Sequence, residues 1–213
     1  MERVAILIGS TGLVGSELLS QLLEDNDYSE IKVFHRRSTG VQHPKLNEEV
    51  IDFDSIDLWA HKIIGDVLFS TLGTTLSTAG SKDAQYKVDY TYQFNVAREA
   101  AKNNVSSFVL VSSAGANADS KMFYTRMKGE LEEAVRKLDF KTVHIMQPSI
   151  LDGERKESRL GESIGLFLMK AFSWMPYIKR YKPITGAEVA RGMRAAINKS
   201  TTGVHTHVLD EIF

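Results

Sequence analysis

The sequence predicts an α/β protein built on a doubly wound parallel β-sheet with helices on both faces. Short apolar runs alternate with segments of helical periodicity along most of the chain, as expected when crossover helices cover both faces of a parallel sheet. A glycine-rich turn joins the first apolar run to the first helical segment. The length of 213 residues suits one domain with a sizeable core. We therefore predict a single domain over residues 1–213.

The expected elements follow from the period of the apolar residues. Strands are expected at Val4–Ile8, Ile31–His35, Glu49–Asp52, Val67–Ser70, Ser107–Val111 and Thr142–Gln147. Helices are expected at Leu13–Glu24, Ser55–Ile63, Ala84–Lys102, Met122–Leu138 and Gly186–Asn198. Thr185 and Glu188 have the spacing of a capping box at the start of the last helix.

Residues 151–183 interrupt the alternation. This segment is rich first in charged and then in aromatic residues. In a doubly wound sheet it lies beyond the carboxyl end of a strand, where ligands bind. We interpret it as a small C-terminal segment that covers a substrate, and the alternative is a packing layer of two helices.

The glycine-rich turn predicts a cradle for a dinucleotide pyrophosphate. Glycines let the backbone turn sharply and approach a ligand closely, and the first N–H groups of the following helix then face the phosphates. The position between a buried strand and a helix makes this reading more specific than the glycines alone. The residues expected to bind the cofactor here are Gly9, Ser10, Thr11, Gly12, Leu13, Val14 and Gly15.

Two arginines after the second expected strand predict NADP rather than NAD as the cofactor. NAD sites usually carry a carboxylate at this point to bind the ribose 2′-hydroxyl. This chain has Arg36 and Arg37 instead, and a guanidinium group matches a phosphate in a bidentate fork. The alternative is a pair of solvated surface arginines.

Two further strand ends offer cofactor contacts. Asp52 can accept a hydrogen bond from the adenine amino group while Phe53 packs beside the base, although aspartate at a strand end is often a turn former. Small residues after the fourth strand would let the backbone lie along the ribose and phosphate on the nicotinamide side, and the alternative is helix capping by threonine hydroxyls. This second set comprises Leu72, Gly73 and Thr74.

A tyrosine and a lysine four residues apart predict acid–base chemistry. Tyr124 and Lys128 fall on one face of an expected helix. An ammonium group beside a phenol stabilises the phenolate and lowers its pKa from about 10. The phenol can then exchange a proton with a carbonyl or alcohol. Taken alone, the spacing often occurs by chance and favours simple helix packing. Ser113, at the end of the fifth strand, can bond the reacting oxygen, and the joint arrangement favours an enzyme.

These pieces together resemble the short-chain dehydrogenases/reductases of the extended or atypical type, and most closely the branch related to the Tat-interacting protein oxidoreductases. The matching pieces span nearly the whole chain and include Gly9-x-Thr11-Gly12-x-x-Gly15, Leu72-Gly73-Thr74-Thr75, Val111-Ser112-Ser113-Ala114-Gly115-Ala116, Tyr124-x-x-x-Lys128-Gly129-Glu130-x-Glu132, Gln147-Pro148-Ser149-Ile150-Leu151 and Glu157-Ser158-Arg159-x-Gly161-Glu162.

The resemblance implies a Rossmann fold, an NADP-type cofactor and a Ser113/Tyr124/Lys128 catalytic set. Tyr124 would act as acid and base, Lys128 would lower its pKa and hold ribose, and Ser113 would orient the substrate. Asn95 matches an asparagine that orders the proton relay in extended members, and the alternative is a helix-face amide without a special task. Where the family has Arg-Pro, this chain has Gln147 before its proline, which leaves the backbone of Pro148 to Ile150 as the expected cofactor contact.

Composition excludes several other classes. The chain has no cysteine, so disulfides and thiol catalysis are excluded, and its formal net charge of −1 gives no basic field for nucleic acid or an anionic membrane. The paired residues His205 and His207 lack a nearby carboxylate pattern, so we expect no metal site. The chain enters a strand directly, without a signal peptide, and no apolar run is long enough to span a bilayer. We expect a cytoplasmic protein with a small-molecule substrate.

The favoured function is therefore an NADP-dependent oxidoreductase that moves a hydride between the nicotinamide and a carbonyl or alcohol carbon. One alternative is a regulatory module in which NADPH occupancy sets the shape offered to a protein partner. A weaker alternative is an epimerase or dehydratase acting on a nucleotide sugar, although extended relatives with that chemistry usually have a longer C-terminal lobe.

Overall fold

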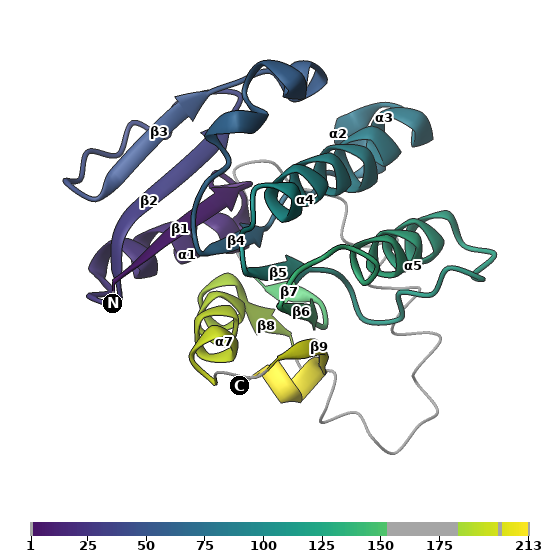
Figure 1. The fold of residues 1–213 in the computed structure, drawn as a ribbon. Helices are drawn as coiled ribbons and strands as arrows, with labels where there is room; N and C mark the ends of the chain where they lie inside the picture. The colour runs from purple at the N-terminus through teal and green to yellow at the C-terminus, as the bar shows by residue number, and fades with distance from the viewer. Residues whose placement is uncertain (1, 153–182, 200–201, 213) are drawn as a thin grey trace.

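A parallel sheet of seven strands forms the centre of the fold, in the order β3-β2-β1-β4-β5-β6-β9 (Figure 1). The computed structural model describes residues 2–152, 183–199 and 202–212. Its strands are β1 (Arg3–Ile8), β2 (Tyr28–His35), β3 (Leu46–Val50), β4 (Val67–Ser70), β5 (Ser107–Val111), β6 (Thr142–Gln147) and β9 (Gly203–Val208). The predicted α/β class and doubly wound parallel sheet are confirmed.

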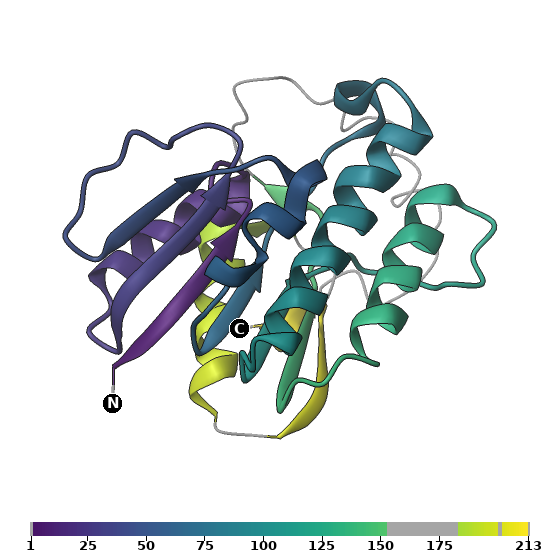
Figure 2. The same cartoon turned by 45° about the horizontal axis from the view of Figure 1, so that its top comes forward.

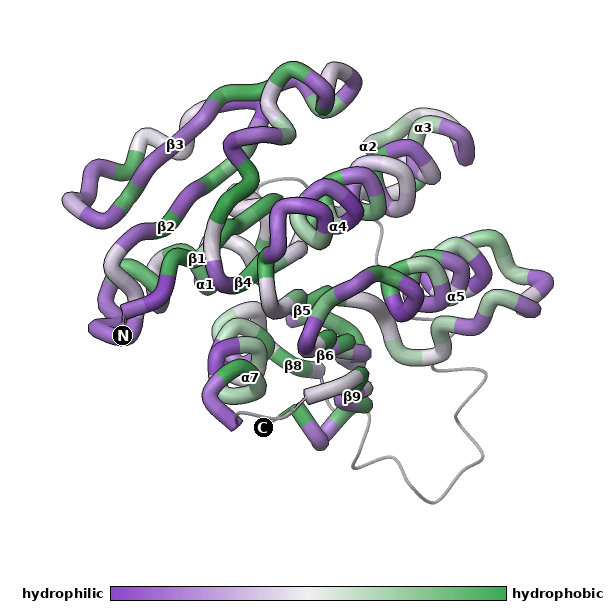
Figure 3. Tube along the Cα trace, viewed as in Figure 1, coloured by the Kyte–Doolittle hydropathy of each residue, from purple (hydrophilic) through white to green (hydrophobic). Residues whose placement is uncertain are grey.

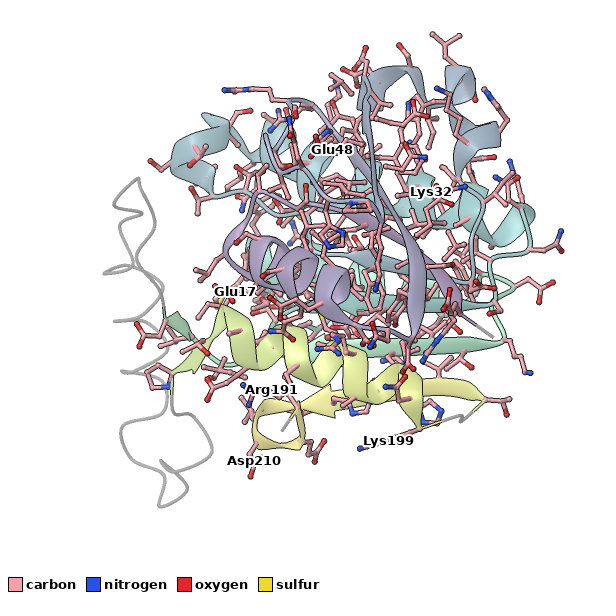
Figure 4. All side chains as sticks on the ribbon, turned by 90° about the vertical axis from the view of Figure 1, so that its left-hand side faces the viewer. Glu17, Lys32, Glu48, Arg191, Lys199 and Asp210 are labelled. Atoms are coloured by element: carbon pink, nitrogen blue, oxygen red, sulfur yellow. The ribbon has the colours of Figure 1, made fainter. Side chains whose placement is uncertain are left out.

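Helices cover both faces of this sheet. The main ones are α1 (Leu13–Glu24), α4 (Gln93–Lys102), α5 (Phe123–Val135) and α7 (Gly186–Asn198), with shorter helices α2 (Leu76–Ala79) and α3 (Lys82–Tyr86). Helices α4 and α5 run side by side over one face (Figure 2). Helices α1 and α7 pack together on the other face, with Glu17 and Arg191 labelled on them (Figure 4).

Two hydrophobic clusters hold these layers together. One joins α1 and α7 to one face of the sheet, and the other joins α4, α5 and the connection after β3 to the opposite face. Strand β4 is buried along its whole length, and the central strands are among the most apolar stretches of the trace (Figure 3). Such continuous apolar runs are what burial of both faces requires.

Two predicted helices have a different form in the structure. The helix expected at residues 55–63 is replaced by two 3-10 helices, Phe53–Leu58 and Ala60–Lys62. The Ser55 hydroxyl bonds back to the Asp52 carboxylate, and such local bonds compete with α-helix formation. The long helix expected at 84–102 is continuous in space but divides into α3, a π-helical turn at Lys87–Tyr92 and α4.

The C-terminal residues form helix α7 and the edge strand β9 of the sheet. The capping box of Thr185 and Glu188 begins α7 as predicted. His205 and His207 lie on β9, and the centroids of both rings are 5.2 Å from that of the His144 ring on β6. Burial lowers the pKa of His144 to about 4, so this ring is neutral at physiological pH. None of the described helices is long and apolar enough to cross a membrane.

The segment predicted to cover a substrate lies almost wholly outside the described residues, and so does Arg159 within it. Its two ends are described. Strands β7 (Leu151–Asp152) and β8 (Ile184–Thr185) pair in parallel and bring these ends together. The cover function of residues 151–183 remains a prediction.

Candidate dinucleotide and catalytic site

The chain changes direction across the sheet between β1 and β4, which are neighbours with their carboxyl ends at the same edge. Open α/β sheets bind ligands in the crevice at such a switch point. The glycine-rich turn follows β1, and the turn from Thr71 to Thr74 follows β4. Two sets of residues predicted separately from the sequence are therefore brought together at one edge of the sheet.

Close backbone packing explains two of the three glycines in the turn. Gly9 has a φ of +88°, and a Cβ there would lie 2.6 Å from the backbone N of Leu72. A Cβ on Gly15 would lie 2.0 Å from the carbonyl oxygen of Gly9. Gly12 is different, because a Cβ there would reach the Gly9 oxygen only at 3.4 Å. The fold leaves room at Gly12, which fits the predicted close approach of a ligand to this residue.

The start of α1 has the features of an anion site. Gly12 is the N-cap and supplies no side-chain hydrogen bond, and the first turn contains no acidic residue. Thr11 and Gly12 are exposed, whereas the hydroxyl of Ser10 is buried and has no hydrogen-bond partner among the described residues. Leu13 packs against the start of α7 at Gly186, and Val14 belongs to the core. These features fit a pyrophosphate bound by the free N–H groups of the helix.

The end of β2 presents the two arginines to solvent. Arg36 and Arg37 are exposed, and within the described residues neither forms an ion pair. The loop that follows is held by Glu48, which accepts hydrogen bonds from the Ser38 hydroxyl at 2.6 Å and from the Thr39 backbone N at 3.1 Å. Burial alone would raise the pKa of Glu48, but these hydrogen bonds hold it below its ordinary value.

Asp52 and Phe53, the residues predicted to contact adenine, form contacts within the protein itself. The Asp52 carboxylate caps the following turn by accepting from the Asp54 backbone N at 2.9 Å and from the Ser55 hydroxyl at 3.1 Å. Phe53 is buried and stacks on Tyr92, with ring centroids 5.2 Å apart. The arrangement agrees with the turn-forming alternative for Asp52, and its contact with adenine stays a prediction.

Lys128 is the most distinctive group of the site, because it is a buried cation. Its side chain is 4% exposed, and its Nζ lies 3.4 Å from Oδ1 of Asp89. Burial by itself lowers the pKa of Lys128, but the charges of Asp89, Tyr124 and Glu132 outweigh it, and the pKa lies above its ordinary value. Lys128 is therefore a fixed ammonium group beside the Tyr124 phenol.

Asp89 also connects this lysine to the turn after β4. Its second carboxylate oxygen accepts from the Thr74 backbone N at 2.8 Å. Asp89 lies within the π-helical turn, a feature frequent at functional sites. One buried carboxylate thus joins the predicted catalytic lysine to the predicted cofactor turn.

Sequence reasoning missed Asp89, and it left Asn95 open between a relay role and a helix-face amide. In the described structure Lys128 pairs with Asp89, and Asn95 has no hydrogen bond that would connect it to the lysine. The available signal was three polar residues at intervals of four. Gln85, Asp89 and Gln93 are all buried, and they bond to the Thr74 region and to Ser70 at the end of β4.

The other predicted site residues are Tyr124 on α5, Ser113 after β5, and Pro148 and Ile150 after β6. Tyr124 is half-buried near the start of α5, and its phenol has no hydrogen-bond partner among the described residues. The Ser113 hydroxyl makes a 3.4 Å contact with the carbonyl oxygen of its neighbour Ala114. The Pro148 carbonyl accepts from the Ala114 N–H at 3.1 Å, and Ile150 is exposed. Their contacts with a cofactor or substrate stay predictions.

Comparison with protein families finds a match to an NAD(P)H-binding family over residues 9–167. Among curated proteins, FMP52-1 of Scheffersomyces stipitis is 36% identical over 193 residues, which are 88% of this chain and 84% of that protein. FMP52 of Saccharomyces cerevisiae is 34% identical over 205 residues, which are 92% of this chain and 88% of that protein.

Solved structures share the fold at low sequence identity. A short-chain dehydrogenase/reductase superfamily protein from Agrobacterium tumefaciens, crystallised with NAD, is 14% identical, with a TM-score of 0.73 over 97% of this chain and 77% of that one. The enzyme WbmH of Bordetella bronchiseptica, in complex with NAD⁺, gives 16% identity and a TM-score of 0.72 over 96% and 75%. The predicted NAD(P)-binding Rossmann fold is confirmed, and the Tat-interacting branch stays a prediction.

One prediction is wrong. The sequence was interpreted as that of a cytoplasmic protein, because no leader signal was found. Both FMP52 relatives carry the designation mitochondrial in their names, and this conflicts with a cytoplasmic location. The absence of a secretory signal excludes only one kind of targeting, since mitochondrial import uses signals of another composition.

Proposed function

This chain belongs to the NAD(P)H-binding family, and from that premise we propose that it is an NADP-dependent oxidoreductase acting on a carbonyl or alcohol. The observation that supports this most directly is the buried ammonium group of Lys128 beside Tyr124, joined through Asp89 to the turn at Thr74. A site that only held a dinucleotide would not need a buried cation next to a phenol.

Each residue has a distinct task in the proposed reaction. Bound NADPH would supply the hydride. Tyr124 donates the proton to the carbonyl oxygen as that oxygen becomes an alkoxide, and in the oxidative direction it accepts the proton. Lys128 keeps a positive charge beside the phenol and would hold the nicotinamide ribose. Ser113 donates a hydrogen bond to the same substrate oxygen and fixes its orientation.

The proposed cofactor specificity comes from the end of β2. Arg36 and Arg37 are exposed and carry no ion pair within the described residues, so their guanidinium groups are available to a 2′-phosphate. An arginine–phosphate pair is directional and charge-assisted. The Glu48 carboxylate in the following segment accepts hydrogen bonds from Ser38 and Thr39, and within the described residues it forms no ion pair with either arginine.

The first test is turnover with NADPH over a panel of aldehydes, ketones and quinones. Wild-type protein is expected to oxidise NADPH with at least one class, and Tyr124→Phe is expected to lower kcat by about 100-fold or more while the Kd for NADPH changes little. Tyr90→Phe is the matched control, because Tyr90 is a half-buried tyrosine stacked on Tyr86. Undiminished turnover by Tyr124→Phe, or a wild type inactive over the whole panel, would contradict the proposal.

The second test addresses the dinucleotide. The double variant Arg36→Ala/Arg37→Ala is expected to raise the Kd for NADPH by about tenfold or more and to change the Kd for NADH by less than about twofold. Arg98→Ala serves as control, since Arg98 is a partly exposed arginine paired with Glu99. Fluorescence titration measures both constants. Equal losses for NADPH and NADH would defeat the assignment of the arginines to the 2′-phosphate.

A further inference from the structure

A second buried carboxylate, Glu132, lies on α5 one turn beyond Lys128. It is 6% exposed. It accepts a hydrogen bond from the Ser112 hydroxyl at 2.5 Å and two from the Gln147 side-chain amide at 2.9 and 3.0 Å. A guanidinium nitrogen of Arg136 lies 3.6 Å from the same carboxylate. A buried charge is tolerated only when it is paired and hydrogen-bonded, and this one is satisfied from three directions.

Two partners of Glu132 come from strand ends that carry predicted site residues. Ser112 directly precedes Ser113 at the end of β5, and Gln147 directly precedes Pro148 at the end of β6. Lys128 lies four residues before Glu132 on α5 itself. The carboxylate therefore contacts the immediate neighbours of Ser113 and Pro148 from the helix that carries Lys128, although no substrate or cofactor contact is assigned to Glu132.

We propose that Glu132 is a positioning residue that fixes the distance between Ser113 and the Tyr124/Lys128 face of α5. This proposal rests on the oxidoreductase function proposed above. Its bonds to Ser112 and Gln147 tie α5 to two adjacent strand ends, and displacement of catalytic groups by about 1 Å can cost 100-fold in rate.

The backbone around Glu132 supports a fixed geometry. The Ser112 N–H bonds to the Met146 carbonyl at 2.7 Å, and Ala114 bonds to Pro148 beyond the strand ends. One turn before Glu132 on α5, a Cβ on Gly129 would lie 2.2 Å from the backbone N of Ala118. The helix is thus held closely against the loop at Gly129 and against the strand ends at Glu132, where the carboxylate forms the polar contact.

The neutral variant Glu132→Gln tests this directly. The amide offers one acceptor oxygen in place of two, so the bonds to Ser112 and Gln147 cannot all persist in their present geometry. We expect kcat to fall by about tenfold or more while KM and the Kd for NADPH stay within about threefold. Glu133→Gln is the matched control, because Glu133 is the exposed neighbour on the same helix and should keep wild-type kcat.

Two further variants separate positioning from general stability. The exchange Glu132→Gln/Gln147→Glu restores one carboxylate facing one amide and should return kcat to within about threefold of wild type. Ser112→Ala removes one donor and keeps the carboxylate–amide pair, so it is the milder variant if Glu132→Gln does not fold. Wild-type kcat in folded Glu132→Gln, a parallel loss of NADPH affinity, or no recovery in the exchange would overturn the proposal.

Amide hydrogen exchange provides a measurement that needs no substrate. In Glu132→Gln, protection of the Ala114 N–H is expected to fall by about tenfold or more, while protection of Val109 in the middle of β5 stays unchanged. If wild type turns over no substrate, the proposed oxidoreductase function is wrong, and the exchange measurement still tests whether Glu132 fixes the geometry of the strand end. Unchanged protection at Ala114, or an equal loss at Val109, would contradict it.

Discussion

Replacing Asp89 with leucine is expected to lower the free energy of unfolding by about 3–5 kcal/mol. The variant leaves the Lys128 ammonium group buried without the carboxylate that lies 3.4 Å from it, and it also removes the acceptor for the Thr74 N–H. Removing one partner of a buried ion pair costs more than the pair contributes, because the remaining charge stays desolvated. Urea unfolding followed by fluorescence or circular dichroism measures the change.

The double variant Asp89→Leu/Lys128→Met distinguishes this explanation from a general packing defect. With both charges replaced by apolar groups, most of the lost stability should return, while turnover should stay absent because Lys128 is gone. Asp54→Leu is the matched control, since the pair between Asp54 and Lys87 is exposed and should contribute little to the free energy of unfolding. If the losses of unfolding free energy in Asp89→Leu and Lys128→Met simply add in the double variant, the two charges are not coupled and the explanation is wrong.

The sequence pattern reveals Tyr124 and Lys128, but it does not reveal Asp89 as the partner of Lys128. Tyr124 and Lys128 are recognisable because their spacing has a chemical meaning within one helix. The partner of Lys128 comes from a different helix, and its identity depends on how α5 packs over the π-helical turn. Asn95 was a reasonable candidate from the motif alone, but the extra residue of a π turn changes which side chains share a face.

The fold was more predictable than the site. Five of the sheet strands (β1, β2, β4, β5 and β6) follow from apolar runs, because burial on both faces requires continuous hydrophobic sequence. The edge strand β3 contains no buried residue, so no apolar run marks its extent. The segment after Asp52 failed as a predicted α-helix because its capping bonds are local side-chain contacts, which periodicity does not detect. Likewise, the Ser112–Glu132–Gln147 contact joins residues up to 35 positions apart, and only the packed structure brings them together.

The glycine-rich turn allows folding and ligand binding to be separated by two alanine substitutions. A Cβ on Gly15 would lie 2.0 Å from the carbonyl oxygen of Gly9, which is backbone and has no room to move. Gly15→Ala is therefore expected to destabilise the fold by about 3 kcal/mol and to abolish NADPH binding, because the turn itself must change.

Gly12→Ala should behave in the opposite way. Gly12 has φ −81° and ψ 171°, which alanine adopts without strain, and its Cβ would lie 3.4 Å from the Gly9 oxygen. We expect the free energy of unfolding to change by less than about 1 kcal/mol, while the Kd for NADPH rises on the order of 100-fold because the methyl group occupies the path of the pyrophosphate. Thermal unfolding and fluorescence titration on the two variants measure both quantities. Normal NADPH affinity in Gly12→Ala would place the phosphates away from the start of α1 and remove the basis for assigning this edge of the sheet to a dinucleotide.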